Sequence, residues 1–81
     1  MTGILMRELP ASSAELLGKA IRQSRRESGL TQREAAAYCN VSLPFLNQVE
    51  QGKPTARIGM VLAVCARFGI EIRAVLPAAP E

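Results

Sequence analysis

Two side-chain amides, those of Asn47 and Gln48, stand next to each other in the middle of the chain. An amide both donates and accepts hydrogen bonds, so either residue could pair bidentately with adenine or make single contacts elsewhere. Both residues lie in a short helical pattern that follows Ser42 and stops at Gly52. The alternative is that they are only the solvated face of that helix.

Positive charge gathers in the segment that precedes these amides. The chain carries ten Lys and Arg against seven Asp and Glu, which gives a net charge of +3. Between residues 19 and 33 a single carboxylate, that of Glu27, opposes five cations. The cations are Lys19, Arg22, Arg25, Arg26 and Arg33. Clustered positive charge favours a polyanionic partner, although it could also be a solvated helix face.

The composition disfavours several classes of function. The chain has no histidine, and Cys39 and Cys65 lie among apolar residues outside any CxxC pair, so a zinc ion would lack ligands. Glycine-rich phosphate loops, nucleophile elbows and clustered carboxylates are absent as well. No apolar run reaches the roughly 20 residues that span a bilayer. We therefore expect a cytoplasmic protein with reduced thiols that is not an enzyme and has no catalytic residues, metal, cofactor or membrane contact.

Length and composition predict one small helical domain. Hydrophobic residues make up 48% of the 81 residues and aromatic residues only 4%, so the core must be built from small and aliphatic side chains. Four helical patterns follow one another between residues 12 and 69. The first begins after Ser12 or Ser13 and ends before Gly29, and the fourth covers roughly residues 58–68. A domain of this size is near the limit of independent stability, and a second copy often completes its core.

The two middle helices are short and are separated by a tight turn. Thr31 caps the helix at residues 32–39, and Glu34 completes a capping box. Asn40 tolerates the left-handed conformation that the turn needs, and Ser42 caps the next helix. Two helices joined in this way are typical of a helix-turn-helix, whose second helix can enter the major groove of DNA.

Both ends of the chain raise the question of strand pairing. Residues 1–11 could form an extended arm or an edge strand. Residues 70–76 begin with alternating apolar and polar side chains and are rich in β-branched residues, which predicts a β-strand. A lone strand needs a partner, either the same strand of a second copy, the segment 4–9, or both. Residues 77–81 are a short tail.

The fourth helix carries apolar residues on more than one face, which is more than a small single core needs. We therefore expect this helix and the following strand to form the interface of a homodimer. The residues predicted for the interface are Val61, Val64, Cys65, Phe68, Ile70, Ile72 and Val75.

A family resemblance lies in three segments, Leu30-Thr31-Gln32, Asn40-Val41-Ser42 and Asn47-Gln48-Val49-Glu50-Gln51-Gly52-Lys53. On the basis of these segments, the part of the chain at residues 16–76 resembles the Cro/C1-type (XRE) helix-turn-helix family. The Gly52-Lys53-Pro54-Thr55 segment, the single fourth helix and a closing strand that starts at Gly69 are similar to the HipB-type antitoxins and their orphan relatives. The resemblance implies a mainly α, lambda-repressor-like domain at residues 12–69, followed by a dimerising strand at residues 70–76.

By position, the resemblance assigns roles to residues around the second helix of the motif. The residues that would face DNA bases are Leu43, Pro44, Asn47 and Gln48. Gln32 and Ser42 fall where the family contacts phosphates, and both lie at helix N-termini, which favour an anion. Arg25 and Glu50 match a partly buried ion pair that orients one helix against another. Pro44 departs from the usual polar residue and removes one hydrogen-bonding base reader.

Three further cations flank helix ends and are candidates to neutralise phosphates, namely Arg33, Lys53 and Arg57. Any one of them is replaceable by another. Tyr38, which the spacing places on the outer side of its helix, could touch the DNA backbone or pack on the fourth helix.

These features predict a homodimeric, sequence-specific repressor. Its two reading helices would lie about 34 Å apart and meet a palindromic operator in double-stranded DNA. In the narrower branch, the resemblance implies an antitoxin that represses its own operon and binds a HipA-like kinase toxin. The alternatives are an orphan regulator without a toxin and a protein-binding module on the same scaffold.

Overall fold

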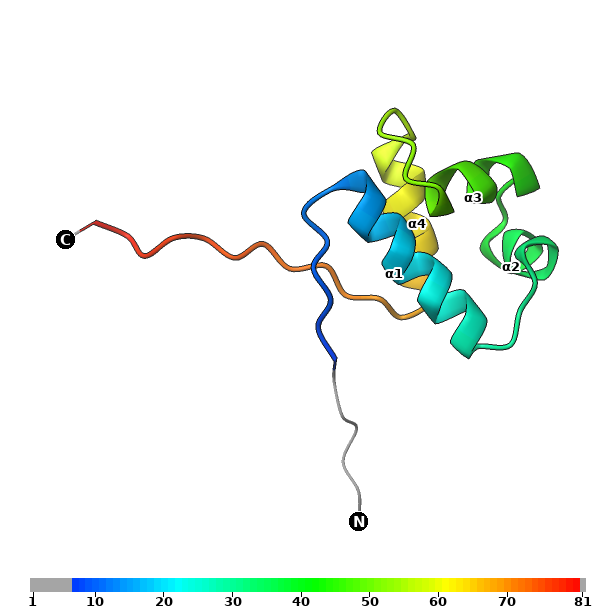
Figure 1. Ribbon diagram of the computed structural model, residues 1–81, viewed down its shortest axis with the longest axis horizontal. Helices are drawn as coiled ribbons and strands as arrows, with labels where there is room; N and C mark the ends of the chain where they lie inside the picture. The colour runs from blue at the N-terminus through cyan, green and yellow to red at the C-terminus, as the bar shows by residue number, and fades with distance from the viewer. Residues whose placement is uncertain (1–6, 81) are drawn as a thin grey trace, which may run out of the picture.

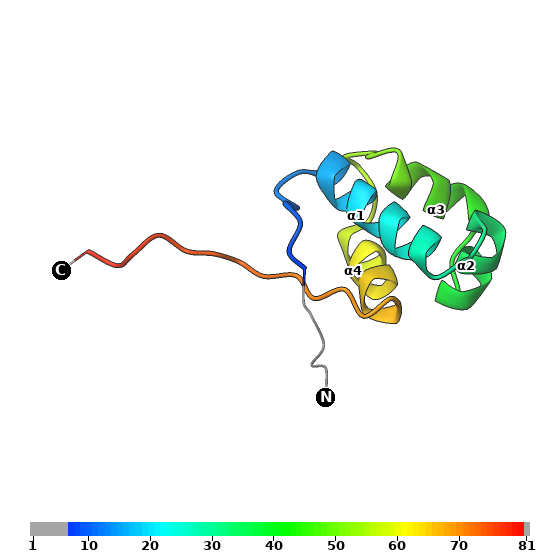
Figure 2. The ribbon, with the colours of Figure 1, turned by 60° about the horizontal axis from the view of Figure 1, so that its bottom comes forward.

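The computed structural model describes residues 7–80, in which four α-helices follow one another (Figure 1). They are α1, Ala14–Glu27; α2, Gln32–Cys39; α3, Leu43–Glu50; and α4, Ile58–Arg67. α1 packs against α3, and α2 packs against both α3 and α4. Figures 1 and 2 show the two end segments leaving this helical body away from α2 and α3. None of the helices in the described residues is long and apolar enough to cross a membrane.

Side-chain caps begin three of the helices as the sequence predicts. The Oγ atoms of Ser13 and Ser42 each accept a hydrogen bond, 3.1 Å long, from the backbone N–H three residues on. Thr31 and Glu34 form the predicted capping box, with hydrogen bonds of 3.1 and 2.8 Å. Asn40 takes the left-handed conformation, at a φ of 57°, and turns the chain from α2 to α3. The prediction of a mainly α chain with four helices is confirmed.

The core lies between the four helices. Its fully buried large side chains are Ile21, Leu46, Val64 and Cys65. Gly18 lets α1 and α3 approach closely, because a Cβ atom at this position would clash with the backbone carbonyl oxygen of Val49. Ala35 and Ala36 bury the inner side of α2. The pair α2 and α3 is thereby fixed against α1 and α4.

Three residues predicted for a dimer surface on α4 belong to this core instead. Val61, Val64 and Cys65 are at most 6% exposed. Phe68 and Ile70 are partly buried and pack against the same core. Because α2 contributes mainly alanines, α4 must fill the core with a broad apolar face. The prediction is therefore wrong for the three buried residues, whose side chains a second copy would not reach.

The segment at residues 70–76 does not form the predicted β-strand in the single chain. No strand forms anywhere between residues 7 and 80, and Val75 is 92% exposed. A β-ladder exists only where a second strand supplies the matching donors and acceptors, and residues 7–11 form none. The strand prediction is therefore wrong for one copy of this chain.

Ion pairs tie the N-terminal segment to its surroundings. Arg7 Nη2 lies 2.6 Å from Glu27 Oε1 at the end of α1. Arg73 Nη1 lies 3.8 Å from Glu8 Oε1, a contact that joins the two end segments. Of the arm or edge strand predicted at residues 1–11, residues 7–11 form no strand, and residues 1–6 lie outside the described part of the chain.

Candidate nucleic-acid interface

α3 turns one side to the core and the other to solvent. The residues buried on its inner side are Leu46, Val49 and Glu50. Of the four residues predicted to face bases, Pro44 and Gln48 are exposed, whereas Leu43 and Asn47 are half-buried. Gln48 Oε1 accepts a hydrogen bond from Lys53 Nζ at 3.3 Å. The outer side of α3 thus offers two amides to a partner, together with an aliphatic side chain and a proline that cannot donate.

A bidentate ion pair fastens α3 to α1. Arg25 donates from Nε to Glu50 Oε2 at 2.7 Å and from Nη2 to Glu50 Oε1 at 2.9 Å. Its third contact is a hydrogen bond of 2.8 Å from Nη1 to the Leu30 carbonyl oxygen. The two side chains are only 10% and 2% exposed. The hydrogen bond with Glu50 raises the pKa of Arg25 above its ordinary value, which keeps the guanidinium charged.

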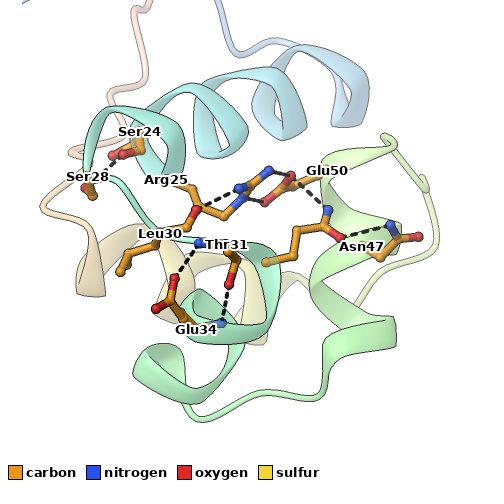
Figure 3. A network of polar contacts seen from close by, with 9 residues as sticks. Ser24, Arg25, Ser28, Leu30, Thr31, Glu34, Asn47 and Glu50 are labelled. Atoms are coloured by element: carbon orange, nitrogen blue, oxygen red, sulfur yellow. Dashed lines mark hydrogen bonds and ion pairs between the residues drawn. The ribbon is translucent and has the colours of Figure 1, made fainter.

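Gln32 joins this ion pair, which Figure 3 shows together with Asn47, to the outer side of α3. Its Nε2 donates to Glu50 Oε1 at 3.0 Å, and its Oε1 accepts from Asn47 Nδ2 at 3.2 Å. The predicted phosphate contact at Gln32 therefore has its side chain already engaged. Sequence reasoning missed this link, because Gln32 and Asn47 lie on two different helices and no spacing rule relates them.

Comparison with known proteins identifies this arrangement. Residues 21–75 match the helix-turn-helix family. The chain belongs to this family. α2 and α3 are accordingly the two helices of the motif, and α3 is the second helix, the one that enters the major groove in proteins of this kind.

This helix-turn-helix protein is similar to regulators from three organisms. It is 41% identical over 61 residues to an HTH-type transcriptional regulator of Sinorhizobium fredii, a match that covers 75% of this chain and 80% of the relative. It is 36% identical over 55 residues to the propionyl-CoA carboxylase regulator of Cereibacter sphaeroides, covering 68% of this chain and 12% of the relative. It is 30% identical over 67 residues to the transcriptional regulator ClgR of Mycobacterium tuberculosis, covering 83% of this chain and 60% of the relative.

The predicted phosphate contacts lie at the ends of the helices. Ser42 caps α3, and Gln32 is the first residue of α2. Arg33 is exposed in the first turn of α2, Lys53 is exposed after α3, and Arg57 is the exposed N-cap residue of α4. All three cations stand outside the core, where a polyanion could reach them.

Tyr38 packs on the end of α4. Its Oη donates to the Arg67 carbonyl oxygen at 3.0 Å, and Arg67 Nε donates to the Tyr38 carbonyl oxygen at 3.2 Å. The Arg67 guanidinium lies 4.4 Å from the centre of the Tyr38 ring, and the Phe68 ring lies 5.9 Å away. Of the two alternatives for Tyr38, the structure selects packing on the fourth helix.

The two cysteines lie in the interior of the helical body. Cys39 and Cys65 are buried free thiols, and burial raises the pKa of both. Within residues 7–80, no three side chains of His, Cys, Asp or Glu gather closely enough to hold a metal ion.

Proposed function

We propose that this protein is a sequence-specific, DNA-binding transcriptional repressor that reads its operator with α3. One observation carries the proposal: the inner side of α3 is locked to α1 by the buried pair of Arg25 and Glu50, while its outer side presents amides. A reading helix must be held in a fixed orientation, because base contacts depend on hydrogen-bond geometry. The named relatives, which are regulators, support the same interpretation.

The contacts divide between the DNA backbone and the base edges. Ser42 at the α3 N-terminus and the cations Arg33, Lys53 and Arg57 bind phosphates, which fixes the register of the protein on the duplex. Gln48 and Asn47 read base edges, and Leu43 offers an apolar contact to a thymine methyl group. Because Pro44 cannot donate a hydrogen bond, direct base readout depends mainly on the two amides.

A second copy of the chain completes the regulator. Ile58 and Leu62, one turn apart on α4, are 64% and 45% exposed, and Ile72 and Val75 stand exposed on a segment that has no strand partner within residues 7–80. Pairing of two copies through these residues would cover apolar surface and supply the missing strand. The dimer would present two copies of α3 to the half-sites of a palindromic operator.

A narrower form of this proposal is that the protein is an antitoxin that binds a HipA-like kinase. It is supported by the Gly52-Lys53-Pro54-Thr55 segment and the single fourth helix. Co-expression with a kinase-like product of a neighbouring reading frame tests it: co-purification in a fixed ratio is expected for an antitoxin. An orphan regulator would bind operator DNA alone and leave such a kinase unbound.

Selection from a pool of random DNA duplexes tests the main proposal. We expect one enriched motif with two-fold symmetry, and an affinity that falls steeply with salt because phosphate contacts release counterions. Gln48→Ala should then weaken operator binding by about 1–3 kcal/mol and relax the preference at one base position in each half-site. No enriched motif, together with a weak salt dependence, would favour the protein-binding module instead.

A further inference from the structure

The charge on Glu50 determines which way the Gln32 amide faces. A carboxylate can only accept hydrogen bonds, and both Glu50 oxygens receive donors from Arg25. Gln32 lies 3.0 Å from Glu50 Oε1 and must therefore turn its NH₂ group toward it. This orientation leaves the Gln32 carbonyl oxygen pointing to the other side, toward α3.

The orientation of Gln32 in turn determines that of Asn47. The Gln32 Oε1 atom accepts a hydrogen bond from Asn47 Nδ2 at 3.2 Å. A flipped Asn47 amide would set two oxygens against each other and lose that bond. Figure 3 shows the Asn47 oxygen turned away from the network. Within residues 7–80, neither Asn47 Oδ1 nor its second amide hydrogen has a partner.

We propose that Gln32 is a positioning residue that presets Asn47 as a reader of adenine, an inference that rests on the proposed function. The preset amide offers one acceptor and one N–H. Adenine is the base whose major-groove edge offers the matching pair, a donor at N6 and an acceptor at N7. Guanine and thymine offer no donor to Asn47 Oδ1 there, and cytosine offers only a donor. The ion pair thus fixes the orientation of the Gln32 amide, and Gln32 fixes the orientation of the Asn47 amide, which contacts the DNA. We call this series of contacts the relay.

The relay differs from the contact that orients Gln48. Lys53 donates to Gln48 Oε1 from an exposed, flexible side chain, whereas Gln32 is half-buried and held by the ion pair. A preset orientation costs less conformational entropy on binding than one formed in the complex. Asn47 should therefore discriminate between bases more sharply than Gln48 does.

The test replaces Gln32 by Met, which keeps the side-chain length and removes both hydrogen bonds. The operator is first selected with the wild-type protein, and the base read by Asn47 is located with Asn47→Ala. Four duplexes that differ only at that base are then titrated. We expect wild type to prefer adenine, and Gln32→Met to lower that preference about tenfold while leaving other positions unchanged. In the Asn47→Ala background, Gln32→Met should have no further effect on base preference.

Gln23→Met is the matched control, because the Gln23 amide also donates to a carboxylate, that of Glu27 at 3.1 Å, but on the exposed side of α1. It should leave every base preference unchanged. If Gln32→Met weakens binding to all four duplexes equally, Gln32 is a phosphate contact and the inference fails while the proposed function stands. A wild-type protein without any base preference would overturn both.

A measurement without DNA keeps the inference testable in the free protein. In the wild type, the exchange rates of the two Asn47 amide hydrogens with water, measured by NMR, should differ by more than those of an exposed side-chain amide, because one of them is bound to Gln32. In Gln32→Met the difference should shrink to that of an exposed side-chain amide. A wild-type difference no larger than that of an exposed amide would show that the Asn47 amide is not preset and would overturn the relay.

Discussion

At the scale of single residues, the ion pair between Arg25 and Glu50 controls the site. The cost of removing two charges from water offsets much of their attraction, so a buried pair adds little net stability by itself. Its importance appears when one partner is lost, because the other charge then stays buried without compensation. Here that loss would also release Gln32, which donates to the same carboxylate.

Replacing Arg25 by Ala should therefore lower both stability and DNA affinity. We expect the free energy of unfolding in urea to fall by about 3 kcal/mol, since the side chains of the pair are almost fully enclosed. The control is Arg26→Ala, which removes a neighbouring but exposed guanidinium and should change stability by less than about 0.5 kcal/mol. Unchanged stability with loss of operator binding alone would make Arg25 a phosphate contact.

A second prediction concerns pH. The hydrogen bond from Arg7, followed by one from Gln23, lowers the pKa of Glu27 from 4.5 to about 2. Because the pKa is lowered, the contact stabilises the folded state above pH 4.5, and this stabilisation is lost as the pH falls toward 2. Carbon NMR of the Glu27 carboxyl should give a titration midpoint of about 2, and Arg7→Gln should raise it toward 4.5. Glu34, whose pKa is lowered by Thr31 instead, should titrate identically in both proteins.

At the scale of elements, the contact between α1 and α3 determines where α3 lies. Gly18 lies against the backbone of Val49 and Glu50, so the two helices approach as closely as their main chains allow. The same approach brings Arg25, two turns further along α1, within reach of Glu50. The missing side chain of Gly18 and the ion pair of Arg25 thus both hold α1 against α3.

Gly18→Ala should push α3 away from α1. The added Cβ meets backbone atoms, which cannot turn aside as a flexible side chain would, and we expect a loss of about 1–3 kcal/mol in thermal unfolding. Gly59→Ala in α4 is the matched control, because no neighbouring atom lies within 4 Å of the place that its Cβ would take. That variant should be as stable as wild type or up to about 1 kcal/mol more stable. Equal behaviour of the two variants would contradict the close contact.

At the scale of the whole molecule, one copy of the chain leaves apolar surface uncovered. Four small helices enclose a single core, yet Leu76 is 81% exposed and the C-terminal segment runs away from the helical body (Figure 1). Exposed aliphatic side chains on an unpaired extended segment are a surface that another strand can cover. The proposed dimer would cover this surface.

Truncation after Ile70 should abolish the dimer, because it removes the apolar segment but keeps the side chain that packs on the core. Sedimentation should show a monomer, and operator affinity should fall roughly 100-fold or more, since the two half-sites are then bound independently. Truncation after Leu76 is the control and should preserve both properties. A dimer of full affinity after truncation at Ile70 would assign the interface to α4 alone.

The helices and the turn between α2 and α3 could be predicted from the sequence alone. Ser13, Thr31, Ser42 and Asn40 act on backbone groups within three or four residues, so their effect does not depend on the rest of the fold. The family motif likewise located the outer side of α3. These features could be read directly, because each is a local interaction.

Features that depend on contacts between elements far apart in the sequence could not be predicted in this way. α4 is apolar on several sides, and only packing against the alanine-rich α2 shows that Val61, Val64 and Cys65 face inward. The segment at residues 70–76 has the composition of a strand, but a strand forms only where a partner supplies its hydrogen bonds. The link from Gln32 to Asn47 exists because α1 and α3 bring Glu50 beside α2, a proximity that spacing along the chain does not encode.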